Sequence, residues 1–167
     1  MIEKTKTKKA NNNKYFVLFA LFVSILLSCN RGEMFYRFQH IPSGNWQTDD
    51  ALVFVMDSLD FRLDKKYQIF IELSANNTFP YRDLQLFIEH NFVDPFFCRD
   101  TIQIALIDEF GRRLGSGVGG LRQLSIPLFT TIALDTAQVY EIRIEHGMGS
   151  NPLRGIERVG VMVVEQN

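Results

Sequence analysis

Cysteine is the residue type whose setting in this sequence points most clearly to chemistry, and the cysteine concerned is Cys29. It directly follows Leu26, Leu27 and Ser28 at the end of an apolar run over residues 15–27, and five lysines precede that run. A basic start, a short apolar segment and a small residue before the cysteine are typical of a cleaved lipoprotein export signal. We expect the thiol of Cys29 to carry acyl chains, which stabilise membrane binding by about 0.8 kcal/mol per buried CH2.

This signal divides the sequence into three predicted parts: a signal peptide over 1–28, a lipidated tether over 29–34 and a folded domain over 35–167. The apolar run is short for a transmembrane helix. The alternative is an uncleaved signal anchor in which the cysteine is incidental.

Cleavage also changes the charge of the protein. It removes five lysines and Glu3 from the 18 basic and 19 acidic residues, which leaves 13 basic and 18 acidic residues and a net charge near −5. Such a chain has no basic stripe that could neutralise phosphates, so nucleic acid is not an expected partner. The remaining 139 residues are enough for one domain with one core.

The other reactive side chains do not form a recognisable catalytic or metal site. Glu141 and Glu145 lie on the polar side of an expected strand, as solvated carboxylates do, and no G-x-S-x-G motif occurs. With Cys29 acylated, no internal disulfide is expected, and Cys98 is either buried or free to pair with another protein. Three histidines are too widely separated for a short zinc-ligand spacing: His40, His90 and His146. The sequence therefore predicts a noncatalytic protein without metal or cofactor.

A glycine-rich segment resembles a nucleotide-binding motif in its letters alone. Residues 115–120 match G-x-G-x-x-G, but a dinucleotide site also needs a following helix whose N-terminus holds the pyrophosphate. Residues 123–127 lead instead into another expected strand. We interpret the segment as a tight loop between strands.

Strands must position these residues, because apolar and polar side chains alternate along most of the domain. Residues 67–74 show the clearest alternation, and no segment after Cys29 has a sustained helical period. Expected strands cover residues 52–56, 67–74, 84–91, 101–107, 130–134, 140–146 and 159–164. Seven to eight short strands with Gly, Pro, Asn and Asp between them predict an all-β antiparallel sandwich, with Trp46 in its core.

Two expected loops carry aromatic residues beside prolines and are candidate partner-binding segments. They contain Phe79 and Tyr81 in one loop, and Phe96 and Phe97 in the other. Proline restrains the backbone, so an adjacent ring loses less conformational entropy on binding. Arg112 and Arg113 could add a charged rim. The alternative is that the rings fold inward and cap the ends of the sandwich.

Four stretches, together with the signal, resemble the GldH family of gliding motility lipoproteins of the Bacteroidota. These stretches are residues 41–46, 76–84, 108–117, and 140–148 followed by 153–160, and they span most of the domain. Two positions depart from the family pattern: Gly119-Gly120, where an acidic residue often follows the glycines, and Gly147, where a larger residue is common.

The resemblance implies an envelope protein that works with other motility lipoproteins and the type IX secretion machinery, and it implies no catalytic residues. In the Bacteroidota, a run of acidic residues after the lipidated cysteine resembles a signal for export to the cell surface. Residues 30–33 lack such a run, which predicts an outer-membrane lipoprotein facing the periplasm. The leading interpretation is a noncatalytic interaction module, and the alternative is a carbohydrate- or peptidoglycan-binding sandwich.

Three short patterns resemble the Asp-Ser/Thr-apolar acceptor of periplasmic O-glycosylation in the Bacteroidota. Their hydroxyl residues are Ser58, Thr101 and Thr136. Three-letter patterns also arise by chance, so both interpretations stay open.

Overall fold

The computed structural model describes residue 15 and residues 33–57, 61–93, 96–134 and 138–166. The chain divides into two compact units, residues 1–31 and 32–167, and the second unit is the folded domain. In the portion of the chain that is described, no helix has the length and apolar character needed to cross a membrane.

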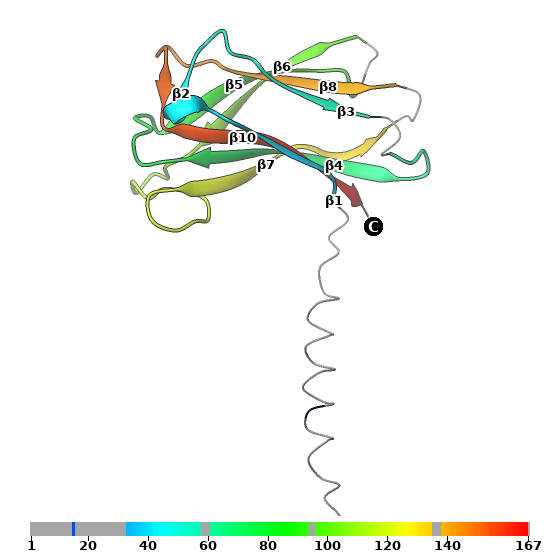
Figure 1. The fold of residues 1–167 in the computed structure, drawn as a ribbon, viewed down its shortest axis with the longest axis horizontal. Helices are drawn as coiled ribbons and strands as arrows, with labels where there is room; N and C mark the ends of the chain where they lie inside the picture. The colour runs from blue at the N-terminus through cyan, green and yellow to red at the C-terminus, as the bar shows by residue number, and fades with distance from the viewer. Residues whose placement is uncertain (1–14, 16–32, 58–60, 94–95, 135–137, 167) are drawn as a thin grey trace, which may run out of the picture. The chain divides into compact units, whose positions relative to one another are not determined.

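The domain is all-β, with two four-stranded antiparallel sheets and a two-stranded ribbon (Figure 1). The first sheet has the order β1 (Glu33–His40), β10 (Ile156–Gln166), β4 (Lys66–Ala75), β7 (Arg122–Ala133). The second sheet has the order β3 (Leu52–Met56), β8 (Tyr140–His146), β5 (Asp83–His90), β6 (Cys98–Ala105). The ribbon pairs β2 (Asn45–Trp46) with β9 (Leu153–Arg154), and a single 3-10 turn, η1 (Pro42–Gly44), precedes it. The predicted antiparallel sandwich is confirmed.

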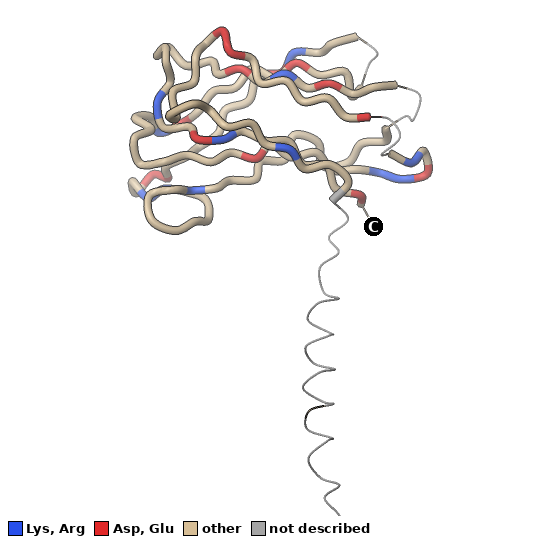
Figure 2. The backbone as a smooth tube through the Cα atoms, viewed as in Figure 1, with Lys and Arg blue, Asp and Glu red and all other residues tan. Residues whose placement is uncertain are grey.

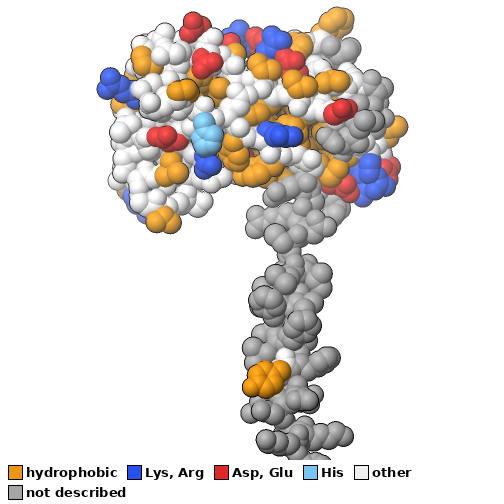
Figure 3. Space-filling view, in the orientation of Figure 1, with side chains coloured by type: hydrophobic (Ala, Val, Ile, Leu, Met, Phe, Trp, Pro, Cys, Tyr) orange, Lys and Arg blue, Asp and Glu red, His pale blue; other side chains and the backbone are white. Residues whose placement is uncertain are grey.

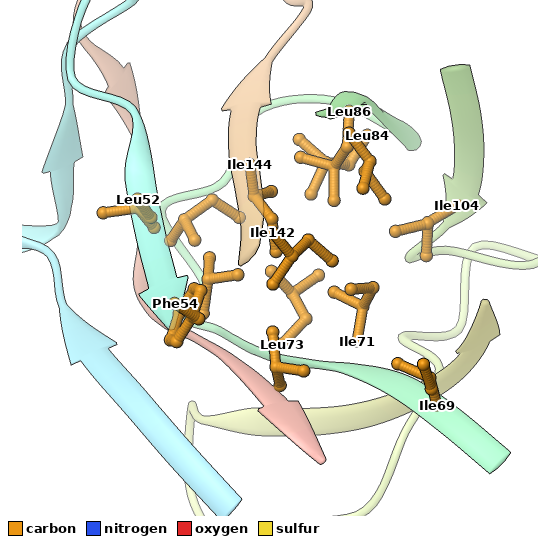
Figure 4. Packing of buried hydrophobic residues seen from close by; sticks show 14 of the residues in the cluster. Leu52, Phe54, Ile69, Ile71, Leu73, Leu84, Leu86, Ile104, Ile142 and Ile144 are labelled. Carbon is orange, nitrogen blue, oxygen red and sulfur yellow. The ribbon is translucent and has the colours of Figure 1, made fainter. Parts of the chain in front are cut away.

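The core lies between the two four-stranded sheets, and the alternating residues of the central strands build it. Ile69, Ile71 and Leu73 of β4 face Ile142 and Ile144 of β8, and all five side chains are fully buried (Figure 4). Full burial of each such side chain stabilises the fold by about 1.5–3 kcal/mol. Trp46 is fully buried as well, as expected.

Among the long strands, β1 and β7 differ most from the expected ranges. β1 was missed because half-buried Phe35 and exposed Tyr36 put aromatic rings on both sides of the strand, which hides the alternation. β7 begins at Arg122 rather than at residue 130, and it contains Pro127. An edge strand tolerates a proline because one row of its N–H groups has no neighbouring strand to bond.

The strand directions give the sandwich two ends with different loops. The polypeptide enters the domain at Glu33, and we call this end the entry end; β1 then runs to His40 at the opposite end, the far end (Figure 1). The entry end holds the described residues of three connections, which are 57 and 61–65, 91–93 and 96–97, and 134 and 138–139. The far end holds the connections over residues 41–51, 76–82, 106–121 and 147–155.

Candidate functional site

The far end brings together the stretches that carry the family resemblance. Backbone hydrogen bonds join three of its connections: the Gly155 N–H donates to Gly44 O at 2.9 Å, and the Asn76 N–H donates to Gly155 O at 2.8 Å. The Ile41 N–H donates to Glu157 O at 3.0 Å. Residues more than one hundred positions apart in the sequence therefore form one continuous surface at this end.

Asn76 is the side chain that fixes the β4–β5 connection. Its amide nitrogen donates to Glu157 Oε1, and its Oδ1 accepts from the N–H of Thr78 at 2.7 Å and from Thr78 Oγ1 at 2.6 Å. A side chain that bonds the backbone two residues on stabilises a turn. The loop thus leaves β4 in one defined direction.

That direction sends Phe79 into the core. Its side chain is only 2% exposed, and a Cβ added at Gly155 would lie 2.2 Å from the Phe79 backbone nitrogen. Because Gly155 has no side chain, the two backbones can pack this closely and the ring turns inward. The predicted role of Phe79 as a partner contact does not fit this burial, and the inward-facing alternative describes it.

Tyr81 is half-buried beside Phe79. The two rings meet edge to face with centroids 5.8 Å apart, and the Tyr81 hydroxyl forms a hydrogen bond with Ser150 Oγ. Tyr81 therefore connects the β4–β5 loop to the β8–β9 loop, and only part of its surface is available to a partner.

Hydrogen bonds to Asp108 hold the turn that carries Phe110, the most exposed aromatic ring of the far end. Asp108 Oδ1 accepts from the N–H groups of Phe110 at 2.9 Å and Arg112 at 2.8 Å, and Oδ2 accepts from Arg112 Nε at 2.7 Å. The Arg112 backbone N–H, followed by its guanidinium, lowers the pKa of the Asp108 carboxyl. Phe110 is 75% exposed, and the Arg112 guanidinium lies 5.3 Å from its ring centroid.

Sequence reasoning missed Phe110 as a candidate contact because no proline adjoins it. The signal that could have found it is an Asx turn, in which Asp108 precedes an aromatic residue and Gly111 within four positions. Arg112 was predicted as a rim residue, and its side chain is exposed here.

Arg113 has a different place from Arg112. Its guanidinium donates to Asn76 O at 3.1 Å and to Asn77 O at 3.0 Å, and the residue is half-buried. Through these two hydrogen bonds, Arg113 connects the β6–β7 connection to the β4–β5 connection. Its predicted role in a charged rim stays a prediction, and both terminal nitrogens of its guanidinium already donate within the domain.

The glycine-rich segment forms a tight loop between strands. Ser116 and Gln123 pair as an isolated bridge, and a Cβ at Gly117 would lie 2.2 Å from Leu121 O. β7 follows the loop instead of a helix, so the structural context of a dinucleotide site is absent there. The exposed Val118 lies at the tip of this loop, next to the Asp108 turn in sequence.

Beneath these loops, His146 joins the far end to the core. Its Nε2 donates to Trp46 O at 3.2 Å, its Nδ1 accepts from the Met148 N–H at 3.4 Å, and its ring meets Trp46 edge to face. Burial lowers the pKa of His146, and this outweighs the opposite effects of the Trp46 contact and the Glu145 charge. The neutral ring suits both hydrogen bonds.

An open depression of about 350 Å³ lies beside the far-end loops. Its lining consists of Tyr81, Arg82, Asp83, Gln85, Gln103 and Met148. Within the described part of the domain, no three His, Cys, Asp or Glu side chains come close enough together to hold a metal ion.

Two of the predicted partner residues lie at the other end of the sandwich. Phe96 and Phe97 are exposed at the entry end, where the Arg143 guanidinium lies 5.1 Å from the Phe97 centroid. The structure thus separates them from Arg112 and Arg113 by the length of the sandwich.

The predicted modification sites and cysteines lie away from the far end or outside the described residues. Thr101 is exposed on β6, so its glycosylation stays a prediction. Cys29, Ser58 and Thr136 lie outside the described residues. Cys98 is half-buried and makes no disulfide.

Comparison with known proteins identifies relatives of nearly the same length. The "Gliding motility lipoprotein GldH homolog" of Christiangramia forsetii is 26% identical over 157 residues, which cover 89% of this chain and 94% of the relative. The "Gliding motility lipoprotein GldH" of Flavobacterium johnsoniae is 23% identical over 150 residues, covering 86% and 91% respectively. Residues 33–163, which include both sheets except the last three residues of β10, match the model of the GldH lipoprotein family. The chain belongs to the GldH lipoprotein family.

Proposed function

We propose that this protein is a lipid-anchored accessory protein of the gliding motility and type IX secretion machinery that acts by binding a protein partner through its far end. The observation that carries the proposal is the Asp108 turn, which holds exposed Phe110 and Arg112 in a fixed arrangement. Family membership supports the motility role, since both named relatives are gliding motility lipoproteins.

The anchor in this proposal is Cys29, acylated at the outer membrane with the domain facing the periplasm. The match to a lipoprotein family and the sequence around the cysteine support it. Two or more acyl chains hold a protein stably at a membrane, whereas one chain binds only reversibly.

The partner surface consists of Phe110 and Arg112, and exposed Val118 lies in the same β6–β7 connection. Aromatic and arginine side chains contribute most of the binding free energy at many interfaces. The three hydrogen bonds to Asp108 fix this turn before any partner arrives, which reduces the conformational entropy that binding must remove. Acidic and basic residues alternate along both sheets, so the exposed ring distinguishes this surface more than its charge does (Figure 2).

A noncatalytic role agrees with the use of the reactive side chains at the far end. Asp108 holds a turn, Glu157 accepts from Asn76, and Arg113 bonds two backbone carbonyls. Each of these side chains is engaged in a structural hydrogen bond, which favours a scaffold for binding.

The experiment is co-purification from crosslinked cells. We compare the wild-type protein, the double variant Phe110→Ala/Arg112→Ala and the control Val55→Ala, which removes an exposed apolar side chain from β3. We expect motility or secretion proteins with the wild type and the control, and at least about tenfold less with the double variant, since truncating a binding hot spot costs 2 kcal/mol or more. Equal recovery from all three would contradict the proposed surface.

One observation favours the second candidate, a carbohydrate- or peptidoglycan-binding module. The depression beside the far-end loops offers Gln85, Gln103 and Asp83 as hydrogen-bonding groups, with Tyr81 at its margin. Cell-wall glycan recovered with the wild type, but lost from Gln85→Ala/Gln103→Ala, would support this alternative.

A further inference from the structure

The entry end carries exposed apolar side chains on all three of its connections. Val93 is 70% exposed and Phe96 is 78% exposed, both between β5 and β6. Leu63 between β3 and β4, and Val139 between β7 and β8, are exposed too. In Figure 3 the entry end lies to the right, where apolar side chains occur beside charged ones. Exposed apolar side chains that gather on one face of a domain mark a surface that contacts a membrane or another protein.

Aromatic rings at the edge of the core pack beside these connections. Phe61 meets Tyr67 and Tyr140 with centroids 5.2 and 5.7 Å apart, and Phe92 stacks on Tyr140 at 5.7 Å. Phe92 also packs edge to face against Phe129 at 5.8 Å. Phe61 and Phe92 thus anchor two of the connections, the one between β3 and β4 and the one between β5 and β6, on rings of the strands.

Direct hydrogen bonds connect two of the three loops. Asn91 Nδ2 donates to Val139 O at 2.9 Å, and Asn91 Oδ1 accepts from the Glu141 N–H at 2.8 Å. Val93 and Val139 are thereby held close to each other. The surface formed by Leu63, Val93, Phe96 and Val139 is called the entry surface below.

We propose that the entry surface rests in the interfacial layer of the membrane that holds the acyl chains of Cys29. This inference rests on the proposed lipidation and adds the orientation of the domain, which that lipidation alone does not determine. Large apolar and aromatic side chains on loop tips are suited to the boundary between headgroups and acyl chains.

The length of the tether supports a membrane partner over a protein partner. Cys29 precedes Glu33 by four residues, and an extended chain spans at most about 3.6 Å per residue, so the two lie within about 14 Å. Glu33 begins β1 at the entry end. The far end lies the length of β4 away, which is about 33 Å for its 10 residues. The tether therefore keeps the entry end within reach of the bilayer, whereas the far end can lie up to about one strand length further away.

The entry end carries charged side chains beside its apolar ones. Lys65 pairs with Glu165 at 2.7 Å, Arg62 pairs with Asp64 at 3.2 Å, and exposed Lys66 follows Lys65 at the start of β4. Each apolar side chain that leaves water contributes about 1.5–3 kcal/mol when fully buried. Since the anchor already confines the domain to the membrane, even a partial gain from several side chains is enough to orient it.

The test uses the full lipidated protein, purified from membranes and reconstituted into phosphatidylcholine vesicles whose acyl chains carry bromine, a quencher of tryptophan. Phe96→Trp and Val93→Trp place the probe in the entry surface, and Phe110→Trp places it at the far end as the matched control. The wild type supplies the background emission of the buried Trp46. All three positions are exposed, so we expect unchanged melting temperatures.

We expect bromine to quench the added emission at positions 96 and 93 and to leave the emission at position 110 unchanged. Vesicle flotation, measured on the same samples, reports the anchor separately. Protein that floats with the vesicles but shows equal emission at all three positions with and without bromine would overturn the orientation and leave the anchor intact. Protein that fails to float would overturn the anchor, and the orientation with it. A crosslink in cells from position 96 to a protein, together with absent quenching, would assign the entry surface to that protein and also overturn the proposal.

Discussion

At the scale of single residues, the far end separates the rings that hold the fold from the ring that faces solvent. Phe79 and Phe110 both lie in loops, yet one is 2% exposed and the other 75% exposed. The neighbours of each ring cause this difference. Gly155 has no side chain, so the Phe79 backbone can pack against it, whereas the Asp108 turn directs Phe110 outward. Equal substitutions at the two positions should therefore affect different properties.

We predict that Phe79→Ala lowers the free energy of unfolding by about 3–5 kcal/mol, because it leaves a cavity in the core. Phe110→Ala should change the same free energy by no more than about 0.5 kcal/mol, since its ring is exposed. Urea unfolding followed by circular dichroism measures both. Similar losses for the two variants would show that Phe110 is also a packing residue.

His146 makes the stability of the fold depend on pH. Its pKa in the folded protein lies below the ordinary value of 6.5, with burial as the main cause. Above pH 6.5 both states are neutral at this residue; as pH falls below 6.5, the unfolded state takes up the proton first, so the unfolding free energy decreases. The loss is complete once the pH passes the folded-state pKa.

We predict that His146→Gln reduces the dependence of the unfolding free energy on pH between about 7.5 and 5. The variant is expected to be less stable than wild type at pH 7.5, because the contact with Trp46 changes, and the difference should shrink toward pH 5. His40→Gln on β1, where the histidine is exposed, controls for removal of an imidazole. An identical slope for wild type and His146→Gln would refute this assignment.

At the scale of elements, side-chain contacts between loops organise the far end. Arg113 bonds the carbonyl oxygens of Asn76 and Asn77 across 37 and 36 positions of sequence. The Leu114 N–H then donates to Leu106 O at 2.9 Å, which closes the base of the β6–β7 connection. This connection is therefore expected to depend on Arg113 for its position.

We predict that Arg113→Ala lowers stability by about 1.5–3 kcal/mol, the range for a hydrogen bond from a charged donor. Amide hydrogen exchange at Leu114 and Ser116 should accelerate more than exchange in β4 and β10. Arg112→Ala is the matched control, because that guanidinium bonds only within its own turn among the described contacts. Faster exchange throughout the sandwich for Arg113→Ala would instead indicate a global role.

Element boundaries could be predicted from the sequence where alternation was the governing signal. β3 and β8 occupy residues 52–56 and 140–146 as expected, because each buries every second side chain. The ribbon of β2 and β9 has two residues per strand, which is too short for any periodicity to register. The inward turn of Phe79 depends on Gly155, 76 positions later, and the position of Arg113 depends on Asn76. Such long-range contacts are absent from local patterns, so the candidate site was predicted only in part.

At the scale of the whole molecule, the sandwich has two ends with separate tasks in our account. The entry end receives the chain at Glu33, next to the tether, and the far end presents Phe110 about one strand length away. An antiparallel sandwich suits this arrangement because the strands of its two four-stranded sheets run from one end to the other. The partner-binding residues predicted from sequence were divided between these ends, and only the fold reveals the division.

We predict that Cys29→Ala releases the protein from the membrane fraction, because the acyl chains cannot be attached. Cys98→Ala is the matched control, since Cys98 begins β6 within the folded domain and lies outside the signal. Fractionation of cells and immunoblotting measure both variants. A Cys29→Ala protein that stays with the membranes would contradict the lipid anchor.

The central claim is that the far end binds the machinery, and site-specific photocrosslinking in intact cells tests it most directly. A photoreactive phenylalanine analogue replaces Phe110 in one strain and Val55, exposed on β3, in another. We predict a crosslink from position 110 to a motility or secretion protein, and at most a trace from position 55. No protein crosslink at position 110, or equal crosslinks from both positions, would contradict the account.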